Sequence, residues 1–162
     1  MQQDGRETRR PALGHLEPLA GEWETESTHP ALPGTVVPGR ATFEWLEGGH
    51  YLIWRERADH PDFPDSIAIL GCGDPAGADP SSDWPGGCLV HSYDSRGVFR
   101  VTGWDAEEGK WQLWRDQPGF SMRCVYTLSA DGDTMTLDCE LSTDGTTWAP
   151  DLHATYRRVG RG

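Results

Sequence analysis

Short hydrophobic strands separated by turn residues run through most of the chain and limit the folds open to it. In "GRATFEWLEGG", Ala41, Phe43 and Trp45 fall on one face of an extended chain, and polar residues take the other face. The pair Asp131-Gly132 lies between two such runs and favours a tight hairpin turn. The pattern gives about ten strands in sequential hairpins, with no helix long enough for a crossover connection. An all-β meander is therefore expected.

The two edge strands of such a meander decide between architectures. Unpaired edges invite aggregation, and closing the sheet on itself removes them. We therefore predict an all-β fold in the form of an antiparallel up-and-down barrel of roughly ten strands. A sandwich of two packed sheets is the second architecture.

The composition fits a single β-rich domain. The chain has 162 residues, enough to bury a core, and its 20 glycines and 12 prolines suit many tight turns. We predict a flexible tail over residues 1–12 and one domain over residues 13–162. Near its start, "ALGHLEPLAG" would form a short helical turn that places three leucines on one face and ends at Pro18. The segment Asp74–Gly87, "DPAGADPSSDWPGG", is predicted to be a long loop that flanks one end of the barrel.

Charge excludes some partners and suggests a compartment. The formal net charge of -12 argues against nucleic acid and against anionic membrane surfaces, both of which attract lysine and arginine. No apolar segment of a signal peptide follows "MQQDGRETRR", and no run reaches the length of a transmembrane helix. We expect a cytoplasmic protein, a monomer or a homodimer, whose partner is a small apolar molecule.

The four cysteines are expected to be mostly reduced in a cytoplasmic protein. No two of them form a Cys-x-x-Cys pair, which argues against a structural zinc site. Pairing about the Asp131-Gly132 turn sets Cys124 directly opposite Cys139, among apolar residues of the same face. Two buried thiols are the first interpretation of this pair, and a redox pair is the second.

A glycine and a tryptophan open the first predicted strand, and arginines lie on the last. Gly21 and Trp23, with Arg157 or Arg158 near the end of the chain, resemble the lipocalin and fatty-acid-binding barrels. The resemblance implies that the tryptophan closes the barrel floor and that an arginine packs over it. If Arg157 is that residue, His153 faces inward; if it is Arg158, the inward residues include Tyr156 and His153 faces solvent.

A longer set of segments narrows the resemblance. "LAGEWETESTHPALPG", "GRATFEWLEGGHYLIWRER" and "YDSRGVFRVTGWD" look like an uncharacterised bacterial family of lipocalin-like domains related to the nitrobindins, over residues 16–159. The resemblance implies a ten-stranded barrel with an internal cavity. Nitrobindins bind haem through a histidine near the C-terminal strand and isomerise peroxynitrite, and His153 is the candidate for that axial ligand here.

Aromatic and polar residues of the predicted strands provide the remaining site candidates, because barrel cavities orient a ligand with a few polar groups. The candidate ligand contacts are Trp54, His91, Tyr93, Trp114 and Tyr156. His91 and Glu56 are also the candidates for an acid/base pair. Neither a Ser-His-Asp arrangement, a nucleotide-binding glycine motif nor a metal motif occurs in the sequence, so no metal is expected.

The leading functional hypothesis is binding of a small, mainly apolar ligand in the barrel. The alternatives are a haem protein of nitrobindin type, for which haem would be the cofactor, and an isomerase or cyclase that uses His91 and Glu56. The sequence does not decide whether the protein is an enzyme.

Overall fold

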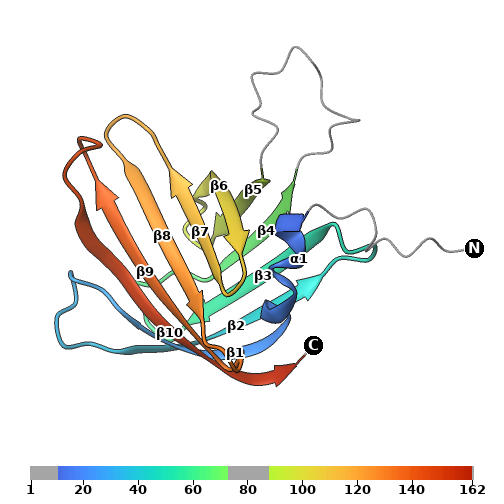
Figure 1. The fold of residues 1–162 in the computed structure, drawn as a ribbon. Helices are drawn as coiled ribbons and strands as arrows, with labels where there is room; N and C mark the ends of the chain where they lie inside the picture. Colours follow the sequence, from blue (N-terminus) through green and yellow to red (C-terminus); the bar gives the residue numbers. More distant parts are fainter. Residues whose placement is uncertain (1–10, 73–87, 162) are drawn as a thin grey trace, which may run out of the picture.

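A computed structural model describes residues 11–72 and 88–161 and shows an almost entirely β structure (Figure 1). Two short helical segments, α1 (Pro11–Gly14) and the 3-10 helix η2 (Glu17–Leu19), precede the strands. The strands are β1 (Gly21–Thr28), β2 (Val37–Trp45), β3 (Tyr51–Ala58), β4 (Ser66–Cys72), β5 (Cys88–Asp94), β6 (Phe99–Glu107), β7 (Lys110–Arg115), β8 (Ser121–Leu128), β9 (Thr134–Ser142) and β10 (Ala149–Arg161).

The strands form one closed antiparallel barrel in which each strand pairs with its neighbours in the sequence, and β1 also pairs with β10. This confirms the predicted up-and-down barrel, and the sandwich alternative was wrong. In Figure 1 the blue β1 and the red β10 lie side by side, which closes the sheet. A shift in register between Glu22 and Trp23 interrupts this last pairing.

Alternation of side chains fills the barrel. Along β1 the residues alternate between buried and exposed from Gly21 to Glu26, as the period of two requires. The same alternation buries Ala41 and Phe43 on β2 and leaves Glu44 exposed. The core is therefore the barrel interior, with aromatic and aliphatic side chains from all the strands.

The helical segments cover part of the barrel with apolar side chains. Leu13, Leu16 and Leu19 are buried in the same core cluster as the strands, as the sequence predicted. Each such burial stabilises the fold by about 2 kcal/mol. Pro18 lies within η2 and not at its end, because a proline fits the first turn of a helix. Of the expected tail, residues 1–10 lie outside the described part, and Pro11 and Ala12 belong to α1. Neither short helix in this part of the chain has the length or apolar surface to cross a membrane.

The cysteines differ from the expectation. Cys124 lies opposite Cys139 as predicted, but the two form a disulfide, and Cys72 forms a second one with Cys88. The expectation of mostly reduced thiols was wrong because both pairs are direct cross-strand partners, and their sulfurs meet across the ladder. The predicted loop Asp74–Gly87 lies outside the described residues.

Candidate functional site

A cavity of about 300 Å³ opens inside one end of the barrel. Its walls come from inward residues of most strands, and its rim comes from the segments that join β3 to β4 and β5 to β6 and from the start of β10. Hydroxyl groups of Thr25, Ser27 and Thr102 lie in the wall among apolar side chains. The arrangement suits a small ligand with a mainly apolar body and few polar groups.

Glu56 is the central polar group of this cavity. It follows Trp54 by two residues on β3, so both side chains point inward, and both line the cavity. The Tyr156 hydroxyl on β10 donates a hydrogen bond of 2.8 Å to Glu56 Oε1. Burial raises the pKa of Glu56 from 4.5 to about 7, and the hydrogen bond from Tyr156 offsets part of that rise.

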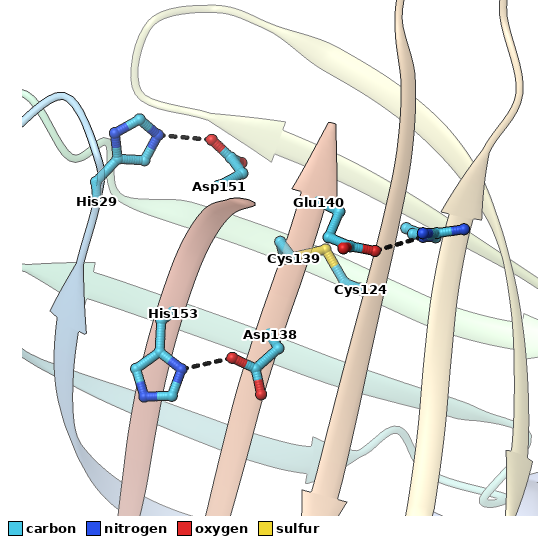
Figure 2. The surroundings of a disulfide bond; sticks show 8 residues. His29, Cys124, Asp138, Cys139, Glu140, Asp151 and His153 are labelled. Carbon is cyan, nitrogen blue, oxygen red and sulfur yellow. Dashed lines mark hydrogen bonds and ion pairs between the residues drawn. A yellow bond between two sulfur atoms is a disulfide. The ribbon is translucent and has the colours of Figure 1, made fainter. Parts of the chain in front are cut away.

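Glu56 differs from the other carboxylates that line the cavity in the described residues. At the rim, Asp94 pairs with Arg96 at 2.6 Å, and Asp151 contacts the His29 ring at 2.6 Å (Figure 2). Glu56 has the Tyr156 hydroxyl as its partner and no cation within ion-pair distance among the described residues. A charged Glu56 is therefore unfavourable in this mainly apolar cavity, and a protonated Glu56 can donate a hydrogen bond.

Aromatic rings surround the carboxyl group. Trp54 lies 5.9 Å from Tyr126 and 5.7 Å from Trp111 between ring centroids, in edge-to-face contacts. Tyr126 stacks on Trp111 at 3.8 Å and lies 6.3 Å from Tyr156. Burial, together with the charge of Glu56, raises the pKa of both tyrosines, so they stay neutral. The wall near Glu56 is thus aromatic and uncharged.

One donor in this wall has no partner in the described residues. Trp54 Nε1 is buried and makes no hydrogen bond, although the rest of its side chain is well packed. A buried N–H without an acceptor costs about 1–3 kcal/mol.

The disulfide Cys124–Cys139 also lines the cavity (Figure 2). It joins β8 to β9 next to Leu137, so it forms part of the apolar wall. The second disulfide, Cys72–Cys88, belongs to the same row of cross-strand partners, which continues through Trp104 and Leu113 to Cys124. Together the two bonds tie β4 to β5 and β8 to β9 at matching positions.

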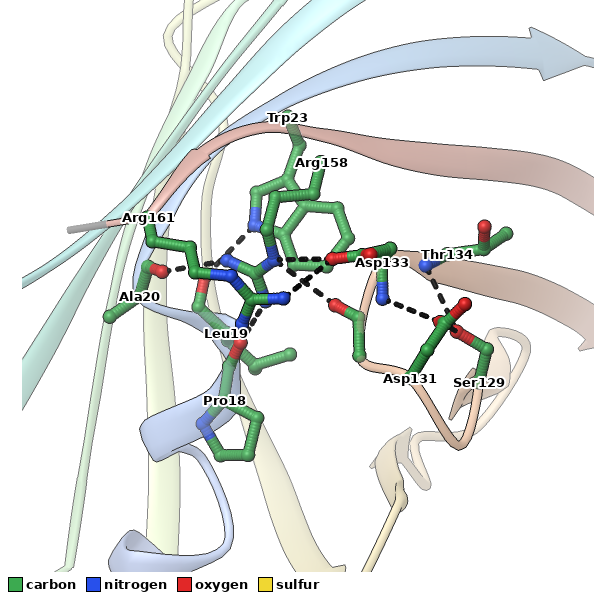
Figure 3. A network of polar contacts seen from close by, with 11 residues as sticks. Pro18, Leu19, Ala20, Trp23, Ser129, Asp131, Asp133, Thr134, Arg158 and Arg161 are labelled. Atoms are coloured by element: carbon green, nitrogen blue, oxygen red, sulfur yellow. Dashed lines mark hydrogen bonds and ion pairs between the residues drawn. The ribbon is translucent and has the colours of Figure 1, made fainter.

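The far end of the barrel is closed by the floor cluster, which we define as Leu19, Trp23, Asp133 and Arg158 (Figure 3). The guanidinium of Arg158 lies 4.2 Å above the centroid of the Trp23 ring. Trp23 Nε1 donates to the Leu19 carbonyl at 2.9 Å. Of the two candidate arginines, it is therefore Arg158 that covers Trp23. Arg157 points outward and pairs with Glu26 at 3.0 Å.

Arg158 satisfies several backbone carbonyls in the floor cluster. It donates to Ala20 O at 2.9 Å, to Gly132 O at 3.1 Å and to Pro18 O (Figure 3). Its side chain is only 5% exposed, and burial lowers its pKa. Gly21 begins β1 with a φ of 128°, a conformation that favours glycine. The Gly-x-Trp start of the first strand thus serves the structure of the barrel floor.

Several residues predicted for the site lie outside the cavity. His153 is on the outer surface, where its Nδ1 lies 2.7 Å from Asp138 Oδ1 (Figure 2). Trp114 is 41% exposed and alternates with the inward Leu113. His91 alternates with the inward Val90, so the structure does not bring it to Glu56. The placements of Trp114 and His91 correct the expected inward positions, because alternation shows which residues share a face but not which face is inside. His153 faces solvent as the alternative with Arg158 over Trp23 requires.

The remaining predicted contacts are close to the cavity. Trp54 lines it, and Tyr156 is fully buried and reaches it through Glu56. Tyr93 reaches the rim from the outer face. Tyr126 was not among the predicted contacts, although it shares a face with Cys124 in the last hairpin. Within the described residues, no group of three metal-ligating side chains occurs.

Comparison with known proteins shows the fold and no closer relationship. No protein-family model matches the sequence, and a search of curated proteins finds no relative. The solved structure of Rv2717c from M. tuberculosis matches with a TM-score of 0.61 and 14% identity, over 93% of this chain and 99% of that one. The S-type phycobiliprotein lyase CPES from Guillardia theta matches with a TM-score of 0.52 and 12% identity, over 98% and 97% of the two chains. The chain therefore has a lipocalin-like barrel fold, which is shared at low sequence identity with these proteins.

Proposed function

We propose that the protein binds a small, mainly apolar molecule inside the barrel, and that this molecule carries an oxygen acceptor. The observation that carries the proposal is Glu56, a buried carboxyl group that has the Tyr156 hydroxyl and no cation as its partner among the described residues, in a mainly apolar cavity. Burial of such a group costs free energy, and a ligand that completes its hydrogen bonds offsets that cost.

The polarity of the site favours an acceptor on the ligand over a donor. Near neutral pH a large share of Glu56 is protonated and can donate a hydrogen bond, because its pKa is about 7. A carbonyl or ether oxygen can accept this hydrogen bond, whereas a ligand ammonium group has no lone pair with which to accept it.

The comparison supports small-ligand binding in general. One barrel of similar fold is a phycobiliprotein lyase, which is consistent with small-ligand binding by a barrel of this kind. We do not extend that activity to this chain, since the identity is 12%. No histidine lines the cavity among the described residues, and His153 lies outside, so we propose neither a haem site nor a His91–Glu56 acid/base pair.

Two probes of similar size test the proposal. 2-Acetylnaphthalene offers a carbonyl oxygen, and 2-ethylnaphthalene replaces it with hydrogen atoms. Titration calorimetry at about pH 6, where Glu56 is mostly protonated, should give about tenfold tighter binding of the ketone. Glu56→Leu should remove this preference, and Glu56→Gln, which keeps a donor, should retain it. Absence of binding by both probes, or equal binding by both, would contradict the proposal.

The paired cysteines also suggest a compartment. Disulfides persist in oxidising compartments and are rare in the cytoplasm. We therefore propose an oxidising location in place of the cytoplasmic one expected from the charge and the first residues. Alkylation of thiols in intact cells before lysis tests this proposal. Alkylated cysteines on the isolated protein would show that the thiols were free in the cell and would indicate a reducing compartment.

A further inference from the structure

Three residues predicted as cavity contacts, His91, Tyr93 and Trp114, lie together on the outside of the barrel. There they belong to a continuous apolar surface over β3 to β7, which we call the outer aromatic face. Its members, all on outward positions, are Tyr51, Ile53, Ile67, Ile69, Leu89, His91, Tyr93, Phe99, Val101 and Trp114.

Strand register makes this face continuous. One row of cross-strand partners runs from Ile53 through Ile69 and His91 to Val101. The row beside it runs from Ile67 through Tyr93 to Phe99. Since cross-strand partners are about 5 Å apart and alternate rows about 7 Å apart, these side chains touch across the sheet.

Large rings cover the glycines of a third row. The ring of Tyr51 lies over Gly71, and the ring of Trp114 lies over Gly103, so closely that an added Cβ would meet ring atoms at 2.5 and 2.6 Å. Leu89 lies between the two glycines in the same row. The rings therefore lie flat on the sheet and present their faces outward.

The exposure of this face is unusual for a single soluble chain. Tyr51, Tyr93, Phe99 and Trp114 are each between 41% and 54% exposed. Phe99 stacks on Tyr93 at 5.1 Å and on His91 at 6.4 Å between ring centroids. Contiguous apolar surface of this kind marks a site of association.

Charge identifies the occupant. The chain has 26 acidic and 14 basic residues, yet charged side chains continue the rows of the outer aromatic face only at its borders, where Arg55 is the partner of Ile67 and Arg123 is the partner of Trp114. The net charge of -12 makes two copies repel through most other surfaces. The same charge also disfavours an anionic membrane. An uncharged aromatic face is complementary to itself and can pair across a two-fold axis.

Size agrees with this assignment. Five strands at about 4.8 Å spacing and three alternate rows cover, with their side-chain margins, on the order of 500 Å². A standard interface buries about 800 Å² per partner, so the outer aromatic face would supply its apolar centre and the polar residues that border it would supply the rim. We infer that the outer aromatic face is the contact through which two copies of this chain form a symmetric dimer.

Sedimentation velocity on the full chain, from micromolar to submillimolar concentration, tests the inference. The wild-type chain should form a species of twice the mass of one chain. Phe99→Asp should raise the dimer dissociation constant at least about 100-fold, since it buries two uncompensated carboxylates in the interface. Val36→Asp is the matched control, because Val36 is 58% exposed and lies outside this face; it should leave dimerisation unchanged.

A second variant separates loss of contact from loss of fold. Phe99→Leu keeps an apolar side chain and should retain the dimer, while thermal unfolding checks that Phe99→Asp still folds. A wild-type chain that stays monomeric at the highest concentration would overturn the inference, as would a dimer insensitive to Phe99→Asp. A monomer that binds phosphatidylcholine vesicles through this face would assign it to a lipid surface and would also overturn the inference.

Discussion

Replacement of Glu56 by Gln should make the protein more stable at alkaline pH and leave it nearly unchanged at acidic pH. The carboxyl group lies inside the barrel with the Tyr156 hydroxyl as its partner, and burial raises its pKa to about 7. Glutamine has almost the same shape and stays neutral at every pH. Its Oε1 can still accept the hydrogen bond from Tyr156.

The size of the effect follows from the two pKa values of Glu56. Below pH 4.5 the carboxyl is protonated in both the unfolded and the folded chain, so its ionisation does not affect stability. Between pH 4.5 and about 7 the unfolded chain releases the proton first, and folding becomes less favourable by about 1.4 kcal/mol per pH unit. Above about pH 7 the loss is complete, at about 2–3 kcal/mol once partial access of water to the cavity is allowed for.

Urea unfolding of the wild type and of Glu56→Gln at several pH values between 4 and 8.5 measures this difference directly (about 0 at the acid end, about 2–3 kcal/mol in favour of the variant at the alkaline end). Glu44→Gln is the matched control, because Glu44 is 74% exposed and its substitution should give no such rise with pH. A difference between wild type and Glu56→Gln that does not change with pH would refute the placement of a neutral carboxyl in the cavity.

Four further outcomes are expected. Arg158→Met should lower the free energy of unfolding by about 2–3 kcal/mol, because it leaves buried carbonyls without a donor, whereas Arg157→Met should cost less than about 1 kcal/mol in the same urea titration. Gly39→Ala should lower the melting temperature, because its Cβ would meet the carbonyl oxygen of the neighbouring strand, while Gly160→Ala, with open space around it, should not. Hydrogen bonds from the Arg96 side chain lower the pKa of Asp94 to about 2. The stabilising effect of the Asp94 carboxylate is therefore present above pH 4 and is lost as the pH falls toward 2. Asp94→Asn should remove this contribution to the change in urea midpoint with pH. Reduction of the two disulfides, which span 15 and 16 residues, should cost about 3 kcal/mol each, seen as an earlier urea midpoint in reducing buffer.

The barrel was predictable because local patterns determine most of it. Alternation of apolar residues sets each strand, and the Asp131-Gly132 turn places Cys124 opposite Cys139 without further information. The closing pair of strands was inferred only from the need to remove free edges. Its register contains a shift at Trp23, which no local pattern reveals.

The candidate site was less predictable, since aromatic residues occur on both sides of this sheet. Trp54 and Trp114 both belong to alternating strands, yet one lines the cavity and the other lies on the outer surface. Alternation gives no absolute direction, so His91 was paired with Glu56 although the barrel wall places them on opposite sides. The two disulfides were not predicted, because the redox state of the cysteines was inferred from the expected cytoplasmic compartment and not from their positions in the strands.

The contact between Arg158 and Ala20 joins residues 138 positions apart, and it lies at the seam between β1 and β10. Every other strand pair joins neighbours in the sequence, so these pairs can form early and locally. Closing the seam costs about 2 kcal/mol more loop entropy than closing a hairpin of about 16 residues. The floor cluster stabilises the barrel at the seam, where this entropic cost arises. The rate of folding should therefore be limited by the pairing of β1 with β10, and unfolding should begin with the separation of these two strands.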